Sequence, residues 1–184
     1  MESEPGLEAL MKAYQGGDPA AVTALVHRLS PQLHRYFLFQ AVSRPHADDL
    51  LQETWMRVHQ ARHTYRAGHP VQPWLFAIAR HVRIDHYRRS HGSGFREESL
   101  EGKEIGASAE VRASAEPDLE TMLAPLPESQ REVIVMLKVS GMSIEEVARA
   151  TASSVGSVKQ KAHRAYERLR NSLGKSRARE GGAS

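Results

Sequence analysis

The chain has 184 residues, of which 40% are hydrophobic and 6% aromatic, and its formal net charge is +3 at pH 7. This length and the low aromatic content favour two small helical domains over one large sandwich or barrel. The absence of cysteine excludes disulfides, thiolate zinc sites and cysteine nucleophiles. No apolar run approaches the ~20 residues of a membrane span, and the acidic residues 1–6 do not resemble a signal peptide. We therefore expect a soluble, cytoplasmic protein without direct membrane insertion.

Helical periodicity dominates the first half of the chain. A first helix is predicted over 7–15, and the Asp-Pro pair at 18–19 is typical of a cap followed by a first-turn proline. The second helix is expected to kink or break at the Ser-Pro pair at 30–31. Further helices are predicted over 46–65 and 73–89, with a glycine- and proline-containing loop between them.

The second half begins after a polar stretch with few apolar residues, 93–116, which we interpret as a flexible linker. A helix is predicted over 128–140. Ser143 and Glu146 then form a capping-box pattern at the start of a short helix. A long basic helix is predicted over 155–173, followed by a disordered tail. No strand is expected anywhere in the chain.

The short capped helix, the turn and the long basic helix together predict a helix-turn-helix. Eight Lys or Arg residues lie between 154 and 179, against Glu167 alone. A second basic island, 80–91, holds four arginines against Asp85. Two separated basic islands in a nearly balanced chain indicate two contacts with a polyanion. The side chains expected to reach phosphates or base edges from the long helix are Ser154, Ser157, Lys159, Gln160, Lys161 and Arg164.

A family resemblance supports this interpretation. From Leu126 to Leu173 the chain reads LPESQREVIVMLKVSGMSIEEVARATASSVGSVKQKAHRAYERLRNSL, which resembles domain 4 of the extracytoplasmic-function sigma factors. That family shows an LP-x-x-x-R-E-V opening, a G-x-S/T-x-x-E-I/V-A helix and a V-G-T/S-V-K-S/T-R helix. The chain departs from the pattern at 160–161, Gln-Lys, where Ser-Arg or Thr-Arg is usual. Residues 150–152, Ala-Thr-Ala, replace the usual leucine-glycine turn.

The first half resembles the same family independently. Asp48 to His59, DDLLQETWMRVH, is similar to the helix that docks on the polymerase clamp. Pro73 to Arg89, PWLFAIARHVRIDHYRR, is similar to the helix that handles the −10 promoter element. His81 stands where the family usually has asparagine, so the base preference at −10 could differ.

The resemblance implies an all-α fold with two small domains, sigma domain 2 and a helix-turn-helix sigma domain 4, joined by a flexible linker. The expected boundaries are 1–92, a linker over 93–116, 117–175 and a tail over 176–184. The residues expected to bind core polymerase are Asp48, Asp49, Gln52 and Glu53. Those expected at the −10 element are Tyr65, Arg66, Arg80, His81, Arg83, Arg88 and Arg89. The six long-helix residues named above are expected at the −35 element.

The implied function is that of a sigma factor, which binds core RNA polymerase through its clamp and flap regions and directs initiation at promoters. It is not an enzyme by itself and needs no cofactor. The resemblance also implies an anti-sigma partner, which in this family is often membrane-bound.

Two alternatives belong to other classes. A transcription regulator could carry a generic helix-turn-helix without sigma activity, and it would not need the acidic face at 48–53. A metal-dependent hydrolase could use His59 and His63, whose i,i+4 spacing occurs in helical zinc sites. It would need further ligands and a pocket of titratable groups. No cysteine or nearby acidic motif supplies them, so the sigma interpretation is preferred.

Overall fold

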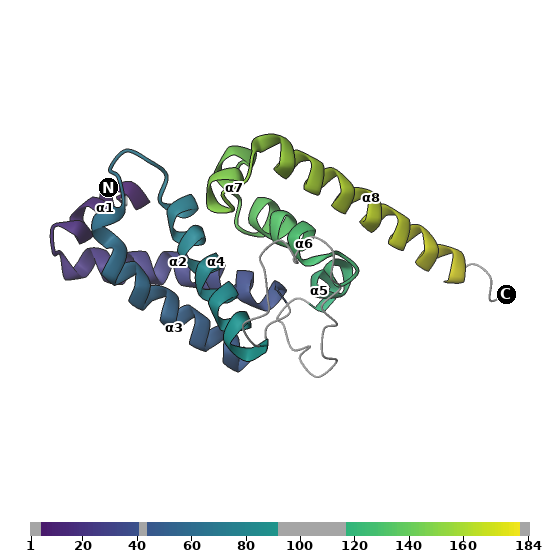
Figure 1. Cartoon of the computed structure of the whole chain (residues 1–184), viewed down its shortest axis with the longest axis horizontal. Helices are drawn as coiled ribbons and strands as arrows, with labels where there is room; N and C mark the ends of the chain where they lie inside the picture. The colour runs from purple at the N-terminus through teal and green to yellow at the C-terminus, as the bar shows by residue number, and fades with distance from the viewer. Residues whose placement is uncertain (1–4, 41–43, 92–116, 181–184) are drawn as a thin grey trace.

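The computed structural model describes residues 5–40, 44–91 and 117–180, which form two helical domains (Figure 1). The N-terminal domain contains α1 (Leu7–Gln15), α2 (Pro19–Phe39), α3 (Arg44–Ala61), the 3-10 turn η1 (Arg62–Thr64) and α4 (Val71–His91). The C-terminal domain contains α5 (Pro117–Leu123), α6 (Glu128–Ile134), the π-helical turn η3 (Val135–Val139), α7 (Ile144–Ala150) and α8 (Val155–Glu180). The described residues contain no strand, as the all-α prediction requires. The predicted linker falls on residues that are not described.

The start of α2 follows the sequence prediction. The Asp18 carboxylate accepts a hydrogen bond from the Ala20 amide at 2.9 Å, and Pro19 occupies the first helical position. Of the predicted kink or break at residues 30–31, the break does not occur, because the helix continues through Pro31 to Phe39. Pro31 is exposed, so its ring faces solvent, while Leu29 and Leu33 on either side are buried. Burial of that face offsets the one backbone hydrogen bond that the proline removes.

Two other helices are longer than predicted. α4 begins at Val71, which puts Pro73 in the third helical position, where the missing N–H has no intrahelical acceptor. α8 runs to Glu180, through Gly174 and into the predicted tail. A single helical glycine costs only about 1 kcal/mol relative to alanine. Several of the residues that follow it, including Lys175 and Arg177, are good helix formers.

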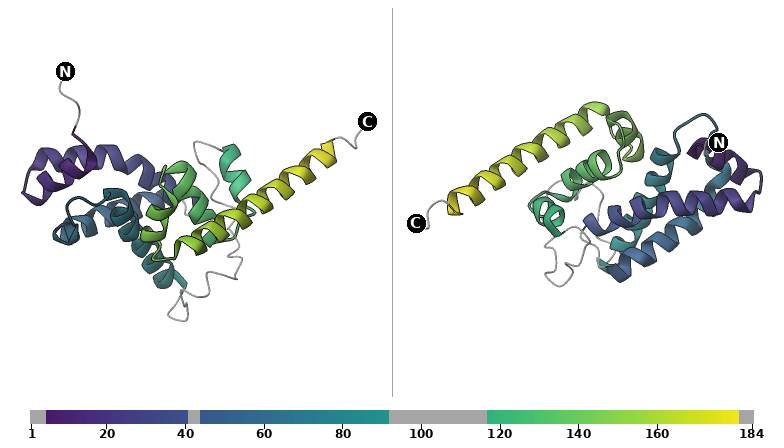
Figure 2. Two further views of the ribbon diagram at one scale, coloured as in Figure 1. Left: turned by 90° about the horizontal axis from the view of Figure 1, so that it is seen from above. Right: turned by 180° about the vertical axis from the view of Figure 1, so that it is seen from behind.

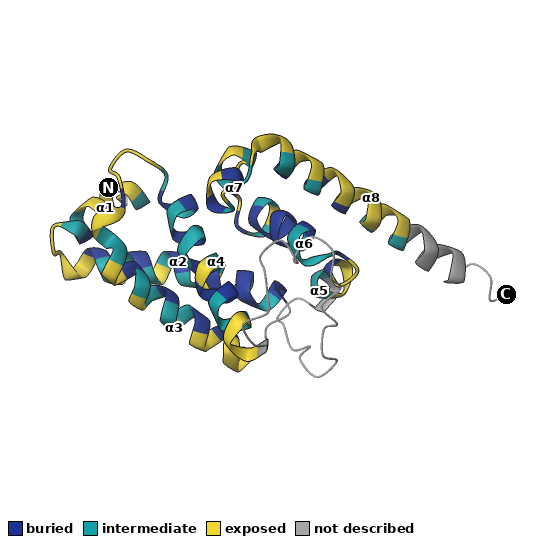
Figure 3. Ribbon diagram, in the orientation of Figure 1, coloured by how far each residue is buried: buried dark blue, intermediate teal, exposed yellow. Residues whose placement is uncertain are grey.

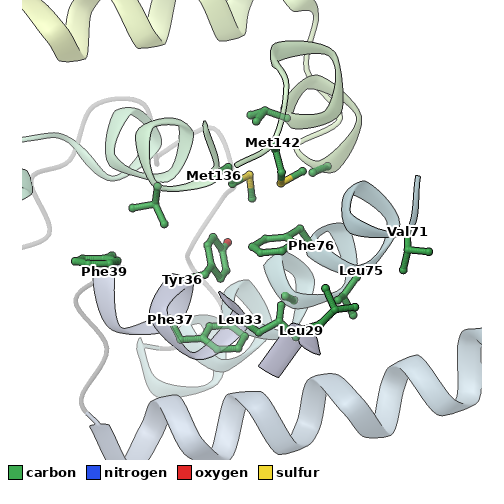
Figure 4. Close-up of a cluster of buried hydrophobic side chains, with 14 of the residues drawn as sticks. Leu29, Leu33, Tyr36, Phe37, Phe39, Val71, Leu75, Phe76, Met136 and Met142 are labelled. Carbon is green, nitrogen blue, oxygen red and sulfur yellow. The ribbon is translucent and has the colours of Figure 1, made fainter. Parts of the chain in front are cut away.

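The core crosses the boundary between the two domains. Buried positions, dark blue in Figure 3, face that boundary from both sides, whereas the outer faces of the helices are exposed. Tyr36 and Phe76 are wholly buried and their rings meet edge to face, with centroids 5.4 Å apart. Met136 and Met142 of the C-terminal domain lie close above these two rings (Figure 4). The domains are therefore packed on one continuous apolar core in this structure.

The long helix α8 runs along the C-terminal domain and projects beyond it, as the two further views in Figure 2 show. Val158 and Ala165 anchor its first half, because both are wholly buried. Of the helices in the described ranges, none combines the length and apolar character needed to cross a membrane.

Candidate functional site

The helix-turn-helix is formed by α7 and α8. The predicted capping box is confirmed, because the Ser143 amide donates to the Glu146 carboxylate at 2.7 Å and the Glu146 amide donates to the Ser143 hydroxyl at 3.2 Å. Ser154 caps α8 in turn, since its hydroxyl accepts from the Ser157 amide at 3.1 Å. The caps define where both helices begin, and they leave the first turns of α8 at the surface.

The predicted DNA-contacting face of α8 is open to solvent. Four of its six residues are exposed and two, Ser157 and Lys161, are half-buried; the exposed ones are Ser154, Lys159, Gln160 and Arg164. Val158 and Ala162 are buried and face the domain, whereas Val155 is 36% exposed. The face can therefore present hydroxyl, amide and cationic groups to a groove of duplex DNA.

The turn between α7 and α8 has a left-handed residue. Ala152 has φ of 51°, and among the described residues other than glycine it is the one with a positive φ. Ala152 belongs to the segment 150–152 that replaces the leucine-glycine turn of the family pattern, and glycine lacks the Cβ that crowds this conformation. The Ser153 amide bonds the Ala148 carbonyl at 2.9 Å, which closes the turn.

A second surface feature is a groove between α2 and α3, which we call the α2–α3 groove. Its volume is about 650 Å³, and it is lined by Val26, Ser30, Asp48, Leu51, Gln52, Trp55, Met56, His59 and Gln60. The Trp55 indole N–H donates to the Ser30 hydroxyl at 2.9 Å, which ties the two helices together across the groove. Met56 is 54% exposed, an unusual position for a large apolar side chain on a folded surface.

The four predicted polymerase-binding residues lie on α3 in and around this groove. Asp48 and Gln52 line it, and Asp49 is exposed. Asp48 lies 3.0 Å from the His34 imidazole of α2. Glu53 pairs with Arg57 at 2.9 Å, and Arg57 also pairs with Asp85 of α4 at 2.8 Å. The groove is thus an apolar surface with an acidic edge, held by polar links to α2 and α4.

Besides Tyr65, the predicted −10 residues fall into two groups. His81, Arg66, Arg88 and Arg89 are exposed. Arg80 and Arg83, with side chains 14% and 7% exposed, lie between the two domains. In this arrangement Arg83 cannot reach a DNA phosphate.

Tyr65 also differs from its expected setting. It is 4% exposed, and its ring packs edge-on against Trp74 with centroids 5.6 Å apart. Its hydroxyl donates to the His69 carbonyl, while the Gln15 amide donates to the Tyr65 carbonyl at 2.9 Å. Tyr65 therefore anchors the loop between η1 and α4 here, and its ring is not open for stacking on a base.

Charged side chains from both domains meet around Arg83, in a group that we call the buried charge cluster. Its members are Tyr36, Arg80, Arg83, Glu128 and Glu132. Arg83 pairs with Glu128 and, at 3.1 Å, with Glu132. The Tyr36 hydroxyl donates to Glu132 at 2.7 Å, and Arg80 lies 3.4 Å from the other Glu132 oxygen.

The pKa values in this cluster follow from its charges. Burial acts to raise the pKa of the Glu132 carboxyl, but Arg83, Arg80 and the Tyr36 hydroxyl more than offset it, so the pKa is lowered. Burial also acts to lower the pKa of Arg83, and the nearby carboxylates more than offset that as well. For Tyr36, burial and the Glu132 charge both raise the pKa. These shifts keep Glu132 and Arg83 charged beside a neutral Tyr36 phenol.

The histidine pair of the hydrolase alternative has a different environment. The His59 ring nitrogen shares a hydrogen bond of 2.9 Å with the Tyr14 hydroxyl, and His63 is exposed. Over the three described ranges, no three His, Asp or Glu side chains gather as a metal site would require.

Two family models match the chain, Sigma-70 region 2 over residues 25–92 and Sigma-70, region 4 over residues 117–169. The ECF RNA polymerase sigma factor SigF of Caulobacter vibrioides is 30% identical over 175 residues, which cover 91% of this chain and 94% of SigF. The chain belongs to the extracytoplasmic-function sigma factors. Another relative is the RNA polymerase sigma factor CarQ of Myxococcus xanthus. It is 31% identical to this sigma factor over 176 residues, which cover 89% of this chain and 95% of CarQ.

Solved structures share the fold. CnrH, in complex with the cytosolic domain of CnrY, matches this sigma factor with a TM-score of 0.71 and 25% identity, covering 91% of this chain and 97% of CnrH. The sigma factor RpoE from Bartonella quintana, in complex with the anti-sigma factor NepR, matches with a TM-score of 0.64 and 24% identity, over 82% and 95% of the two chains. This sigma factor directs RNA polymerase to promoters for initiation, and sigma factors are non-catalytic initiation factors.

Two residues of this sigma factor, Met56 and Glu132, were not predicted as functional from the sequence. Met56 was not assigned to the polymerase-binding face, although it lies one turn after Gln52. Glu132 was not singled out, although helical spacing puts it on the face that carries Val135 and Met136, both wholly buried. A carboxylate on a buried helix face needs a cationic partner, and that signal was available in the sequence.

Proposed function

We propose that this sigma factor binds core RNA polymerase through the α2–α3 groove, and that Asp48, Asp49, Gln52 and Glu53 form the contact. An apolar groove with an acidic edge fits a partner helix that carries apolar and basic side chains. The half-exposed Met56 and Trp55 would supply apolar contact area, and the carboxylates would orient the partner.

The first turns of α8 read the −35 element as duplex DNA. Lys159 and Arg164 are exposed and cationic, which suits phosphate contacts, and Gln160 offers an amide that can pair with a base edge. Ser154 and Ser157 lie at the helix start, where backbone amides also favour a phosphate.

The loop that begins at Arg66 and the exposed face of α4 engage the opened −10 strand. His81, Arg88 and Arg89 are exposed on α4 and so are within reach of a single strand. Arg80 and Arg83 become accessible to the −10 strand only after the two domains separate. Tyr65 serves this surface by holding the loop in place, through its contacts with Trp74 and His69.

An anti-sigma protein regulates this sigma factor in the cytoplasm. The support is that RpoE was solved with the anti-sigma factor NepR, and CnrH was solved with the cytosolic domain of CnrY. A membrane-bound anti-sigma partner would sequester the protein at the inner face of the membrane.

One observation carries the proposal: an exposed basic helix of a helix-turn-helix and an acidic-edged apolar groove occur in the same chain. A generic helix-turn-helix regulator would need the first feature alone. Run-off transcription with core polymerase, on the DNA upstream of the protein's own gene, tests it. We expect a discrete transcript only when this protein is added, and equal output without it would overturn the proposal.

A further inference from the structure

The buried charge cluster pairs basic groups of one domain with acidic groups of the other. Arg80 and Arg83 come from α4, whereas Glu128 and Glu132 come from α6. The side chains of Arg83 and Glu132 are 7% and 6% exposed, so water has little access to their ion pair. The sites at which these arginines would hold DNA are thus occupied from within the protein.

We propose that Glu128 and Glu132 substitute for DNA phosphates in the free protein, and that they keep Arg80 and Arg83 in a closed state unable to bind the −10 strand. This inference rests on the proposed function, because it assumes that α4 binds DNA. It adds that the C-terminal domain competes with nucleic acid for the same guanidinium groups.

Carboxylates are suited to this substitution. A guanidinium binds carboxylate and phosphate oxygens with the same planar geometry, often through two N–H groups at once. Arg83 uses separate nitrogens for Glu128 and Glu132, so both of its terminal amino groups are occupied. A phosphate can reach Arg83 only when these carboxylates leave.

The makeup of the interface also fits a reversible closure. Buried ion pairs contribute little net stability compared with apolar side chains of similar volume, because both charges lose their hydration. Once the domains part, the carboxylates regain water and the arginines gain phosphate partners. An interface made only of groups like Phe76 and Met136 would offer no such exchange.

The variant that tests the closure is Glu128→Gln with Glu132→Gln. Both residues lie outside the surfaces proposed for polymerase and for −35 DNA. The matched control is Glu120→Gln with Glu145→Gln, which removes the same charge from the same domain at positions outside the cluster. Because the chain has no cysteine, spin labels can be attached solely at Lys12→Cys and Arg168→Cys, on exposed positions of the two domains.

Two measurements follow on the full-length protein. Double electron–electron resonance gives the distance between the labels. Fluorescence anisotropy gives the affinity for a fluorescein-labelled single-stranded oligodeoxynucleotide of random sequence, since phosphate contacts do not depend on sequence.

We expect one narrow distance distribution for the wild type and the control, and a longer, broader one for the cluster variant. The cluster variant should bind the oligonucleotide at least about tenfold more tightly, because a larger fraction is competent to bind. The slope of log affinity against log salt should steepen by about 0.7 for each arginine released.

Unchanged distances in the cluster variant would overturn the closure. Longer distances without tighter binding would overturn the competition with DNA. If the double variant fails to fold, Glu128→Gln alone should give the same shifts at smaller amplitude, and no shift there would overturn the inference. Failure of the proposed function is distinguishable, because it would appear as no transcription by the wild-type protein with core polymerase.

Discussion

Ala152 adopts φ of 51° in the turn of the helix-turn-helix, and its side chain is exposed. The left-handed conformation costs an L-residue with a Cβ about 1–2 kcal/mol, and glycine avoids most of this cost. Glycine also loses more conformational entropy on folding than alanine, which offsets part of this gain. We therefore expect Ala152→Gly to raise the free energy of unfolding by a net amount of about 0.5–1 kcal/mol. Urea denaturation measures the change.

The control for this substitution is Ala9→Gly, at an exposed position in α1. There glycine has no conformational advantage, and it should lower the free energy of unfolding by about 0.5–1 kcal/mol. Equal destabilisation by both substitutions would show that the turn is not strained at Ala152.

His81 is exposed on α4, at the position where the family usually has asparagine. An amide presents a donor and an acceptor side by side, whereas a neutral imidazole presents them on separate nitrogens across the ring. We expect His81→Asn to change the base preference at −10 and to leave the −35 preference unaltered. Selection from randomised promoters by both holoenzymes measures this, and superimposable −10 profiles would limit His81 to a non-specific role.

Glu132 gives the protein a defined response to acid. Its folded-state pKa lies below the usual value of about 4.3, so its contribution to stability is fully present above that pH and is lost as pH falls through the lowered pKa. At pH 7, Glu132→Gln should lower the free energy of unfolding by up to about 3–5 kcal/mol, because Arg83 loses a buried partner. Opening of the domains limits this loss, since it returns Arg83 to water.

The difference in free energy of unfolding between wild type and Glu132→Gln should shrink as pH falls below about 4, because the unfolded chain then binds a proton at Glu132 that the folded protein does not. Denaturant titrations at several pH values measure this difference. At pH 7 the exposed substitution Glu145→Gln should change the free energy of unfolding far less than Glu132→Gln does. A constant difference for Glu132→Gln down to pH 3 would contradict the lowered pKa.

At the scale of elements, α3 carries the proposed contact with polymerase. Asp49→Arg with Glu53→Arg replaces attraction by repulsion, which should weaken core-polymerase binding by several kcal/mol. The fold should persist, because Asp49 is exposed and loss of the partly exposed Glu53–Arg57 pair costs only about 0.3–0.5 kcal/mol.

Pull-down of core polymerase measures the loss, with circular dichroism to check the helices. The control is Glu8→Arg with Glu145→Arg, which makes the same change of charge at exposed sites away from the α2–α3 groove. Similar recovery of polymerase by both double variants would contradict the assignment of this face.

Local chemistry decides how well each element can be predicted. The caps at Asp18 and at Ser143 with Glu146 were predicted because each depends on side chains within a few residues of the backbone that they bond. Pro31 and Gly174 were expected to interrupt helices and do not. Proline or glycine inside a helix destabilises it, but the neighbouring residues can favour the helical conformation strongly enough to continue it. Packing of another element against the opposite face of the helix can also outweigh the destabilisation.

At the scale of the whole molecule, sequence patterns predicted two helical domains but not how they meet. Arg83 and Glu132 lie 49 residues apart, and helical periodicity shows only that each shares a face with buried neighbours. Which buried charge meets which depends on the docking of α4 against α7 and of α2 against η3. The same docking explains why Arg83, predicted as a DNA-contacting residue, is buried in this structure. Tyr65, also predicted to contact DNA, is buried by Trp74 within the N-terminal domain.

The closed arrangement and promoter binding require different exposure of Arg83 on α4. The closed form covers Arg83, whereas the proposed −10 contact requires it to be open. Core polymerase would shift the equilibrium from the closed to the separated form if it bound the two domains at separated positions. This requires that the separated form bind polymerase more tightly than the closed form does.

Permanganate footprinting on the DNA upstream of the gene tests the central claim, that this chain makes core polymerase open a promoter. Permanganate oxidises thymines that are unpaired and unstacked. We predict that thymines around −10 become reactive when core polymerase and this protein are both present, and stay unreactive with either alone. Reactivity that is the same with and without the protein would contradict the account.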